Sequence, residues 1–165
     1  MWGLSLHPYV VFLPAEQKDK ILSAIFGSKA SLEILRFSLK QGIDRKIYQK
    51  DLVEKLEYSN KTIIGNLKTL TSLGILLESM EKAEHEGRTV WIKAYRLSDT
   101  GKWFALLIAE EKELSDKEKA EILQNIFRSY IKWVKSLSEK LHMDKEIFKK
   151  IFDEEMENEK YKWTP

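Results

Sequence analysis

Polar side chains that suit contacts to nucleic acid recur at helical spacing in the middle of the chain. Apolar residues three and four positions apart predict an amphipathic helix over about residues 60–73, with one buried face made of Ile63, Ile64, Leu67, Leu70 and Leu73. Side chains of the types on its opposite face donate hydrogen bonds to phosphates and contact base edges. That face carries no carboxylate and consists of Lys61, Thr62, Asn66, Lys68, Thr69 and Ser72. It predicts a DNA contact, with an ordinary solvated helix face as the alternative.

The segments before this helix are expected to hold it in place. Ser28 is a predicted N-cap for a helix over residues 29–41, and Gly42 closes that helix. A polar connection over residues 43–47 then leads into a helix over residues 48–56. Ser59 or Asn60 caps the central helix, and Gly74 ends it in the left-handed conformation that glycine adopts without steric cost.

After Gly74 the apolar period changes from helix-like to strand-like. Residues 75–81 and 89–97 are rich in β-branched and aromatic side chains, so they predict a hairpin with a charged loop over residues 82–88. Gly87 supplies the backbone conformation that the tip needs. Both faces of the second strand are apolar, and we expect the N-terminal arm or a terminal helix to cover the outer one.

The two ends of the chain are predicted to add an arm and four more helices. Residues 1–14 form an apolar arm, a short helix follows over residues 17–26, and another covers residues 102–112. Ser115 and Glu118 form a capping box for a helix that reaches residue 141, and Asp144 caps the last helix, with an acidic tail that frays over residues 153–159. The predicted domain organisation is residues 1–14, 15–112 and 113–160.

Three motifs in this order resemble the winged helix-turn-helix transcription regulators of the ArsR/MarR type, found in bacteria and archaea. Residues 25–35 match the helix pair that precedes the DNA-recognition elements, and residues 62–76 match the recognition helix with the strand after it. Gly87, Arg88 and residues 95–101 match the wing tip, second strand and following helix cap. The resemblance covers about residues 18–109. It implies a mainly α fold with a small β-hairpin wing, the helix of residues 60–73 in the major groove, and a wing over residues 75–97.

Carried over residue by residue, the resemblance implies DNA contacts from two helices and from the wing. The matching positions are Asn60, Lys61, Thr62, Asn66, Lys68 and Thr69 on the recognition helix, Gln49 and Lys50 on the helix before it, and Arg88 at the wing tip. Lys61 and Asn66 are expected to be exposed, so that alanine there weakens binding and leaves folding intact. The chain departs from the family at the wing, where Glu81, Glu84 and Glu86 would repel phosphate.

The appended helices carry a wide apolar stripe over residues 122–141, which either packs on its own domain or pairs with a second copy. Amphipathic helices appended to such a domain suit pairing across a two-fold axis, which matches palindromic half-sites. We therefore expect a homodimer, with the arm over residues 1–12 joining an interface centred on Ile126, Tyr130, Trp133 and Leu137.

The composition limits the remaining possibilities. The formal net charge is only +2, with 16 Lys and Arg against 12 Asp and Glu up to residue 109 and 12 against 14 beyond it, so the N-terminal part is the expected nucleic-acid side. The chain has no cysteine, which excludes disulfides and thiolate sites. His7, His85 and His142 are scattered and predict no metal site. No phosphate-binding loop or Ser-His-Asp grouping stands out, so neither a cofactor nor an enzyme is predicted.

The sequence therefore predicts a cytoplasmic, homodimeric, DNA-binding transcriptional regulator with no membrane span, and it leaves a small-molecule effector open. The rival reading is a winged-helix module that binds another protein within a larger assembly. Near-neutral charge and the acidic wing favour the rival, and the free polar face of residues 61–72 speaks against it.

Overall fold

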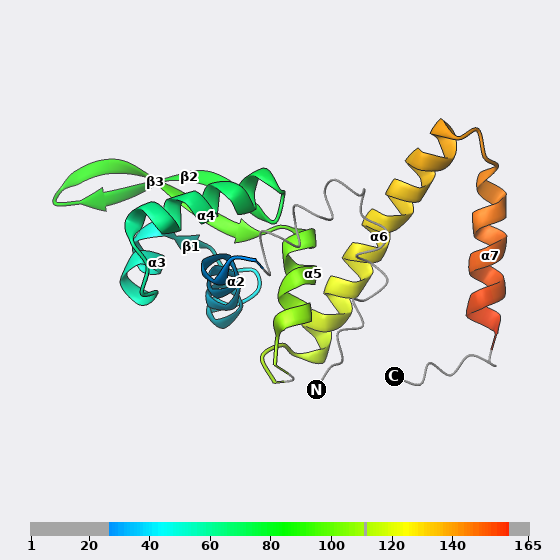
Figure 1. Ribbon diagram of the computed structural model, residues 1–165, viewed down its shortest axis with the longest axis horizontal. Helices are drawn as coiled ribbons and strands as arrows, with labels where there is room; N and C mark the ends of the chain where they lie inside the picture. The colour runs from blue at the N-terminus through cyan, green and yellow to red at the C-terminus, as the bar shows by residue number, and fades with distance from the viewer. Residues whose placement is uncertain (1–26, 111, 159–165) are drawn as a thin grey trace. The chain divides into compact units, whose positions relative to one another are not determined.

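The computed structural model describes residues 27–110 and 112–158 (Figure 1). The predicted arm over residues 1–14 and the predicted helix over residues 17–26 lie outside these residues. The chain is mainly helical with one small antiparallel sheet, which confirms the coarse fold prediction. In chain order the elements are α2 (Lys29–Gln41), β1 (Ile47–Tyr48), α3 (Gln49–Lys55), α4 (Asn60–Ser72), β2 (Leu76–His85), β3 (Arg88–Leu97), α5 (Asp99–Ile108), α6 (Asp116–Lys140) and α7 (Lys145–Glu157).

The chain divides into two compact units, residues 1–126 and 127–165, and the division falls inside α6. The N-terminal unit therefore contains α2 to α5, the sheet and the beginning of α6. The C-terminal unit contains the rest of α6 and α7. The domain borders that the sequence suggests, after residues 14 and 112, stay predictions.

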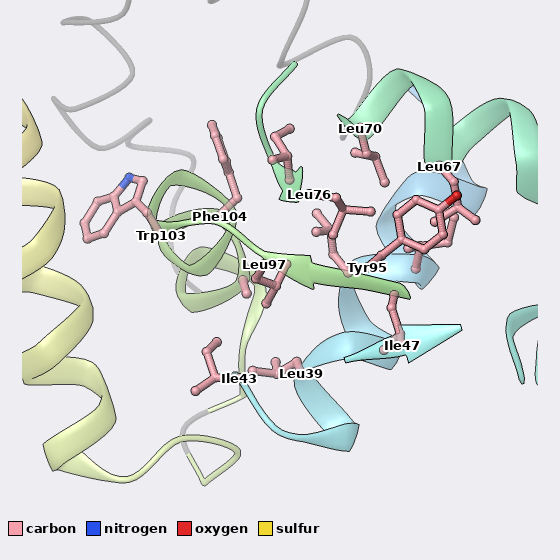
Figure 2. Close-up of a cluster of buried hydrophobic side chains, with 14 of the residues drawn as sticks. Leu39, Ile43, Ile47, Leu67, Leu70, Leu76, Tyr95, Leu97, Trp103 and Phe104 are labelled. Carbon is pink, nitrogen blue, oxygen red and sulfur yellow. The ribbon is translucent and has the colours of Figure 1, made fainter. Parts of the chain in front are cut away.

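The N-terminal unit is organised around one apolar core between its helices and its sheet. Figure 2 shows side chains from α2, α4, α5 and the strands converging in it. Leu114 and Ile122 add side chains from the start of the last helical region, at 4% and 3% exposure. At about 25 cal/mol per Å² of buried apolar surface, a core of this kind provides the main driving force for folding. Its largest fully buried side chains are those of Ile34, Leu35, Ile47, Leu52, Ile63, Leu67, Leu70, Ile75, Leu76 and Phe104.

The sheet has the strand order β1-β3-β2 and contains one strand that the sequence analysis missed. Ile47 pairs with Tyr95 and Tyr48 with Ala94, so the predicted polar connection over residues 43–47 is wrong at its end. Two residues are too few to produce a recognisable alternation of polar and apolar side chains. Ile43 and Ile47 are buried at 4% and 1% exposure, because they close the edge of the core.

The hairpin is longer than predicted. β2 and β3 pair along all ten residues, from Leu76 opposite Leu97 to His85 opposite Arg88. The turn consists of Glu86 and Gly87, at φ 51° and 73°, so the predicted loop over residues 82–88 is wrong. The distal part of the hairpin projects beyond α3 and α4 (Figure 1), and Val90 and Trp91 there are 37% and 59% exposed. Val90 and Trp91 lie on opposite faces of β3, so the outer part of neither face is buried, and the N-terminal arm expected to cover one of them lies outside the described residues.

Most helix ends lie where the sequence predicts them. Ser28, Ser59 and Asp144 accept hydrogen bonds from the first turns of α2, α4 and α7, which confirms all three caps. The Ser115–Glu118 capping box is also confirmed, with the Ser115 amide 2.8 Å from a Glu118 carboxylate oxygen and the Glu118 amide 3.2 Å from Ser115 Oγ. α5 begins earlier than predicted, with Ser98 as its cap, and it ends at Ile108. α7 continues to Glu157, so the predicted fraying from residue 153 is wrong.

The C-terminal unit has a different character. Phe127 of α6 and Phe152 of α7 pack with their ring centroids 5.7 Å apart, and Tyr130 stacks on Trp133 at 6.1 Å. α7 contains no buried residue. Large apolar side chains are exposed along both helices and the turn between them, namely Ile131, Leu137, Leu141, Met143, Ile147, Ile151, Phe152 and Met156.

Candidate nucleic-acid interface

α4 presents one face to the core and the opposite face to solvent. Ile63, Leu67 and Leu70 are buried at 0–1% exposure and fix the rotation of the helix. Lys61, Lys68, Thr69 and Ser72 are exposed on the other face, and Thr62 is half-buried. Because no residue of this helix is acidic, the exposed face carries positive charge only.

Asn66 faces the protein, contrary to the expectation that it is exposed. Its Oδ1 accepts hydrogen bonds from Ser28 Oγ at 2.8 Å and from Ser31 Oγ at 2.7 Å, both at the start of α2. Its Nδ2 donates to the Thr62 carbonyl oxygen at 2.9 Å. The sequence pattern placed Asn66 on the polar face, but the side chain joins α4 to α2. It therefore holds the helix in place and has little capacity left for a base edge.

Two hydroxyl groups on the exposed face of α4 donate to carbonyl oxygens of the helix itself. Thr69 Oγ1 donates to the Gly65 carbonyl oxygen at 3.1 Å, and Ser72 Oγ donates to that of Thr69 at 2.8 Å. Their oxygens remain able to accept hydrogen bonds. Within the described ranges Lys61 and Lys68 take part in no ion pair, so these two ammonium groups are the donors that the face offers.

The start of α3 is tied to the start of α4. Gln49 Nε2 donates to Asn60 Oδ1 at 2.8 Å, so these two predicted DNA contacts are brought together. Lys50 is exposed and lies 3.8 Å from Glu54, one helical turn away on the same helix. An exposed pair at this separation contributes little to stability. Lys50 can therefore leave Glu54 for a phosphate at small cost.

The acidic residues of the hairpin are partly neutralised, which the sequence did not reveal. Lys46 forms an ion pair with Glu81, and Tyr48 Oη donates to the same carboxylate at 2.8 Å. The hydrogen bond from Lys46, followed by that from Tyr48, lowers the pKa of Glu81. Lys93 lies 2.9 Å from Glu78. The acids of the hairpin that would still repel phosphate are therefore chiefly Glu84 and Glu86, which are exposed near the tip.

The outer part of the hairpin combines cations with exposed apolar surface. Arg88 is exposed and opposes His85 at the last pair before the turn. Lys82 Nζ lies 5.3 Å from the centroid of the Trp91 ring, a cation–π contact between directly opposed residues. Sequence reasoning overlooked Lys46, Lys82, Trp91 and Lys93 as partners. The register of the hairpin brings Lys82 and Lys93 to their partners, and the pairing of β1 with β3 brings Lys46 near Glu81.

The described residues contain no group of three or more His, Asp or Glu side chains arranged to hold a metal ion. Two shallow hollows of about 360 and 310 Å³ are lined mainly by charged side chains, one along α7 and the other between α2 and the turn before α4. Neither has the apolar lining typical of a small-molecule site. None of the described helices is both long enough and apolar enough to cross a membrane.

Comparisons with known proteins do not identify a family for this chain. No family model matches the chain, and no curated protein matches it. Among solved structures the chain is similar to a protein from Methanosarcina mazei Go1 that is described as a possible transcriptional regulator. The two share 22% sequence identity with a TM-score of 0.38, over 76% of this chain and 85% of that one. A likeness this weak carries no argument about function.

Proposed function

We propose that this protein is a winged helix-turn-helix regulator of transcription that binds double-stranded DNA in the manner of the ArsR/MarR type. α4 enters the major groove and the hairpin is the wing. The observation that carries the proposal is the acid-free outer face of α4, whose two lysines are unpaired within the described ranges while the opposite face is locked into the core. Regulation follows from occupancy of the DNA and needs no catalysis.

The spacing of the two lysines supports this geometry. Lys61 and Lys68 are seven residues apart, which is about 10 Å along a helix with a rise of 1.5 Å per residue. The major groove is about 12 Å wide. Two ammonium groups at this separation suit phosphates on the two edges of one groove. In this arrangement Thr62 and Thr69 face base edges, Lys50 reaches the backbone, and Gln49 with Asn60 holds the two helices together. Asn66 positions α4 and makes no direct contact.

The C-terminal unit supports a homodimer. Residues 127–140 carry four Lys or Arg and one Glu, whereas α7 carries three Lys and five Asp or Glu. Opposite charge beside exposed apolar stripes favours α6 of one copy against α7 of another. We place Tyr130, Trp133 and Leu137 in this interface. Ile126 packs against the N-terminal core, so it supports that unit instead.

The experiment is an electrophoretic shift of the purified protein on the DNA upstream of its own gene, with random duplex as competitor. A retarded complex that the competitor does not remove is expected. The salt dependence is measured as well, because each neutralised phosphate contributes about −0.9 to the slope of log K against log salt. Lys61→Ala and Lys68→Ala should each flatten the slope by about one phosphate contact per protomer. Lys117→Ala, at an exposed position near the start of α6, is the matched control and should leave the slope unchanged.

A second candidate function has one observation in its favour. Met80 and Trp91 expose 50% and 59% of their surface on one face of the hairpin, and neighbouring exposed apolar side chains suit a protein partner. In that case the hairpin docks on another protein and α4 contributes nothing. The absence of any complex with DNA at micromolar protein and low salt would favour this function.

A further inference from the structure

Gly65 lies in the middle of α4 on its exposed face. Glycine is among the least favourable residues for a helix interior, because it loses the most backbone freedom on folding. A Cβ atom at this position would meet no other atom within 4 Å. Alanine therefore fits the fold at this position, and the described structure supplies no steric reason for glycine.

Four other glycines show what such a reason looks like. Gly42, Gly74 and Gly87 adopt φ of 120°, 72° and 73°, which strain any residue with a side chain. Gly101 lies so close to the β2 entry that a Cβ would be 2.1 Å from the Ile75 carbonyl oxygen. Each is required by the fold of the protein itself, and Gly65 differs from all four.

The neighbours of Gly65 are the residues proposed to contact DNA. Lys61 and Thr62 precede it by four and three positions, and Lys68 and Thr69 follow by three and four, so all of them surround it on one helix face. Thr69 Oγ1 bonds to the Gly65 carbonyl oxygen, which holds that side chain against the helix. The surface of this face is therefore closest to the helix axis at Gly65, and the side chains of the two lysines on either side extend further out.

We propose that Gly65 is the point of closest approach between α4 and DNA, where the helix backbone lies against base-pair edges in the major groove. The inference rests on the proposed function. Without a side chain at residue 65, the helix axis comes near enough for the short Thr62 and Thr69 side chains to touch bases. A methyl group there holds the helix away from the groove floor, while the long lysines still reach phosphates. Gly65 thus determines sequence specificity and contributes little to non-specific binding.

The test compares Gly65→Ala with the wild-type protein in three measurements: melting temperature, affinity for the upstream duplex, and affinity for random duplex. The melting temperature is expected to rise. Affinity for the upstream duplex should fall at least tenfold, while affinity for random duplex stays within about threefold, because non-specific binding is electrostatic. Gln124→Ala, at an exposed position of α6 outside the proposed DNA-contacting face, is the matched control and should change none of the three.

The outcomes separate this inference from the proposed function. If the wild type binds the upstream duplex, Lys68→Ala weakens it, and Gly65→Ala does not, the inference is overturned and the proposed function stands. A lower melting temperature for Gly65→Ala would overturn the inference as well, since the glycine would then serve the fold. If the wild type binds no DNA, both fail together.

Discussion

The two units of this chain have similar apolar side chains but use them differently. In the N-terminal unit the leucines and isoleucines of the core are buried to 0–4% exposure. In residues 127–157 the buried residue is a serine, Ser138, and large apolar side chains such as Leu141 and Ile151 are exposed to 59% and 50%. An amphipathic stripe predicts that a face will be buried, but it does not identify what buries it. The first unit buries an apolar core within one chain, whereas the second leaves most of its large apolar side chains exposed.

The largest expected effect tests the completeness of the N-terminal unit. Gly101→Ala places a methyl group 2.1 Å from the Ile75 carbonyl oxygen and 3.2 Å from a Leu97 methyl group. Backbone atoms on one side must then move, and we expect a loss of about 3 kcal/mol of unfolding free energy. Urea unfolding followed by circular dichroism measures it. The same substitution at Gly65, where no atom stands nearby, should not destabilise the protein, and equal losses at both sites would contradict the prediction.

A second change removes a polar contact inside the same unit. Asn66→Ala leaves the hydroxyl groups of Ser28 and Ser31 without their acceptor, and Ser31 is fully buried. An unsatisfied buried donor costs about 1–3 kcal/mol, so we expect a loss near 2 kcal/mol. Asn66→Asp keeps an oxygen acceptor and should recover part of that loss. Thr69→Ala, exposed on the same helix, should stay within about 0.5 kcal/mol; a larger loss there than at Asn66 would sink the structural role of Asn66.

A third change should affect the C-terminal unit alone. Leu137→Glu places a charge in the proposed interface, and we expect the dimer to weaken at least tenfold, which is about 1.4 kcal/mol. Analytical ultracentrifugation measures the mass, and hydrogen exchange over α7 should become faster in the variant. Ser136→Glu adds the same charge at an adjacent exposed position and should leave the dimer intact. A wild type that sediments as a monomer would contradict the proposal that the C-terminal unit buries its apolar faces against a second copy.

The smallest effect is a pH dependence confined to the N-terminal unit. The hydrogen bond from the Ser115 backbone amide lowers the pKa of Glu118, and the Lys46 hydrogen bond lowers that of Glu81. A lowered pKa stabilises the fold above the usual value near 4.5, and this stabilisation is lost as the pH falls through the lowered value. Glu118→Gln should cost below about 1 kcal/mol at pH 7 and flatten the loss below pH 4.5. Urea midpoints at pH 7 and pH 3.5 measure it, and an unchanged pH profile would count against it.

Local signals in the sequence predicted much of the N-terminal unit. The caps at Ser28 and Ser59 and the glycine after α4 depend on residues within one turn, which a linear sequence displays. The buried face of α4 followed from its apolar period. These features were sufficient to place α4 and its polar face.

The features that the sequence did not reveal share a physical cause, because each of them depends on a contact with a residue distant in sequence. Asn66 has the same position on the helix whether its amide meets solvent or Ser28, 38 residues earlier. Glu81 looks like a repulsive acid until Lys46, 35 residues away, is placed beside it. Periodicity predicts the direction of a side chain, and only the packed fold supplies its partner.

The hydrogen bonds of Asn66 also bear on how this surface can be re-engineered. A combinatorial library over α4 that randomised every polar position would lose members to misfolding at residue 66, because that amide links two helices. Three exposed positions, Lys61, Lys68 and Thr69, can vary without that loss. Under the proposed function, point mutations can therefore reach fewer DNA-binding specificities than the polar face suggests. Substitutions at these three positions are expected to change DNA binding and to leave folding intact.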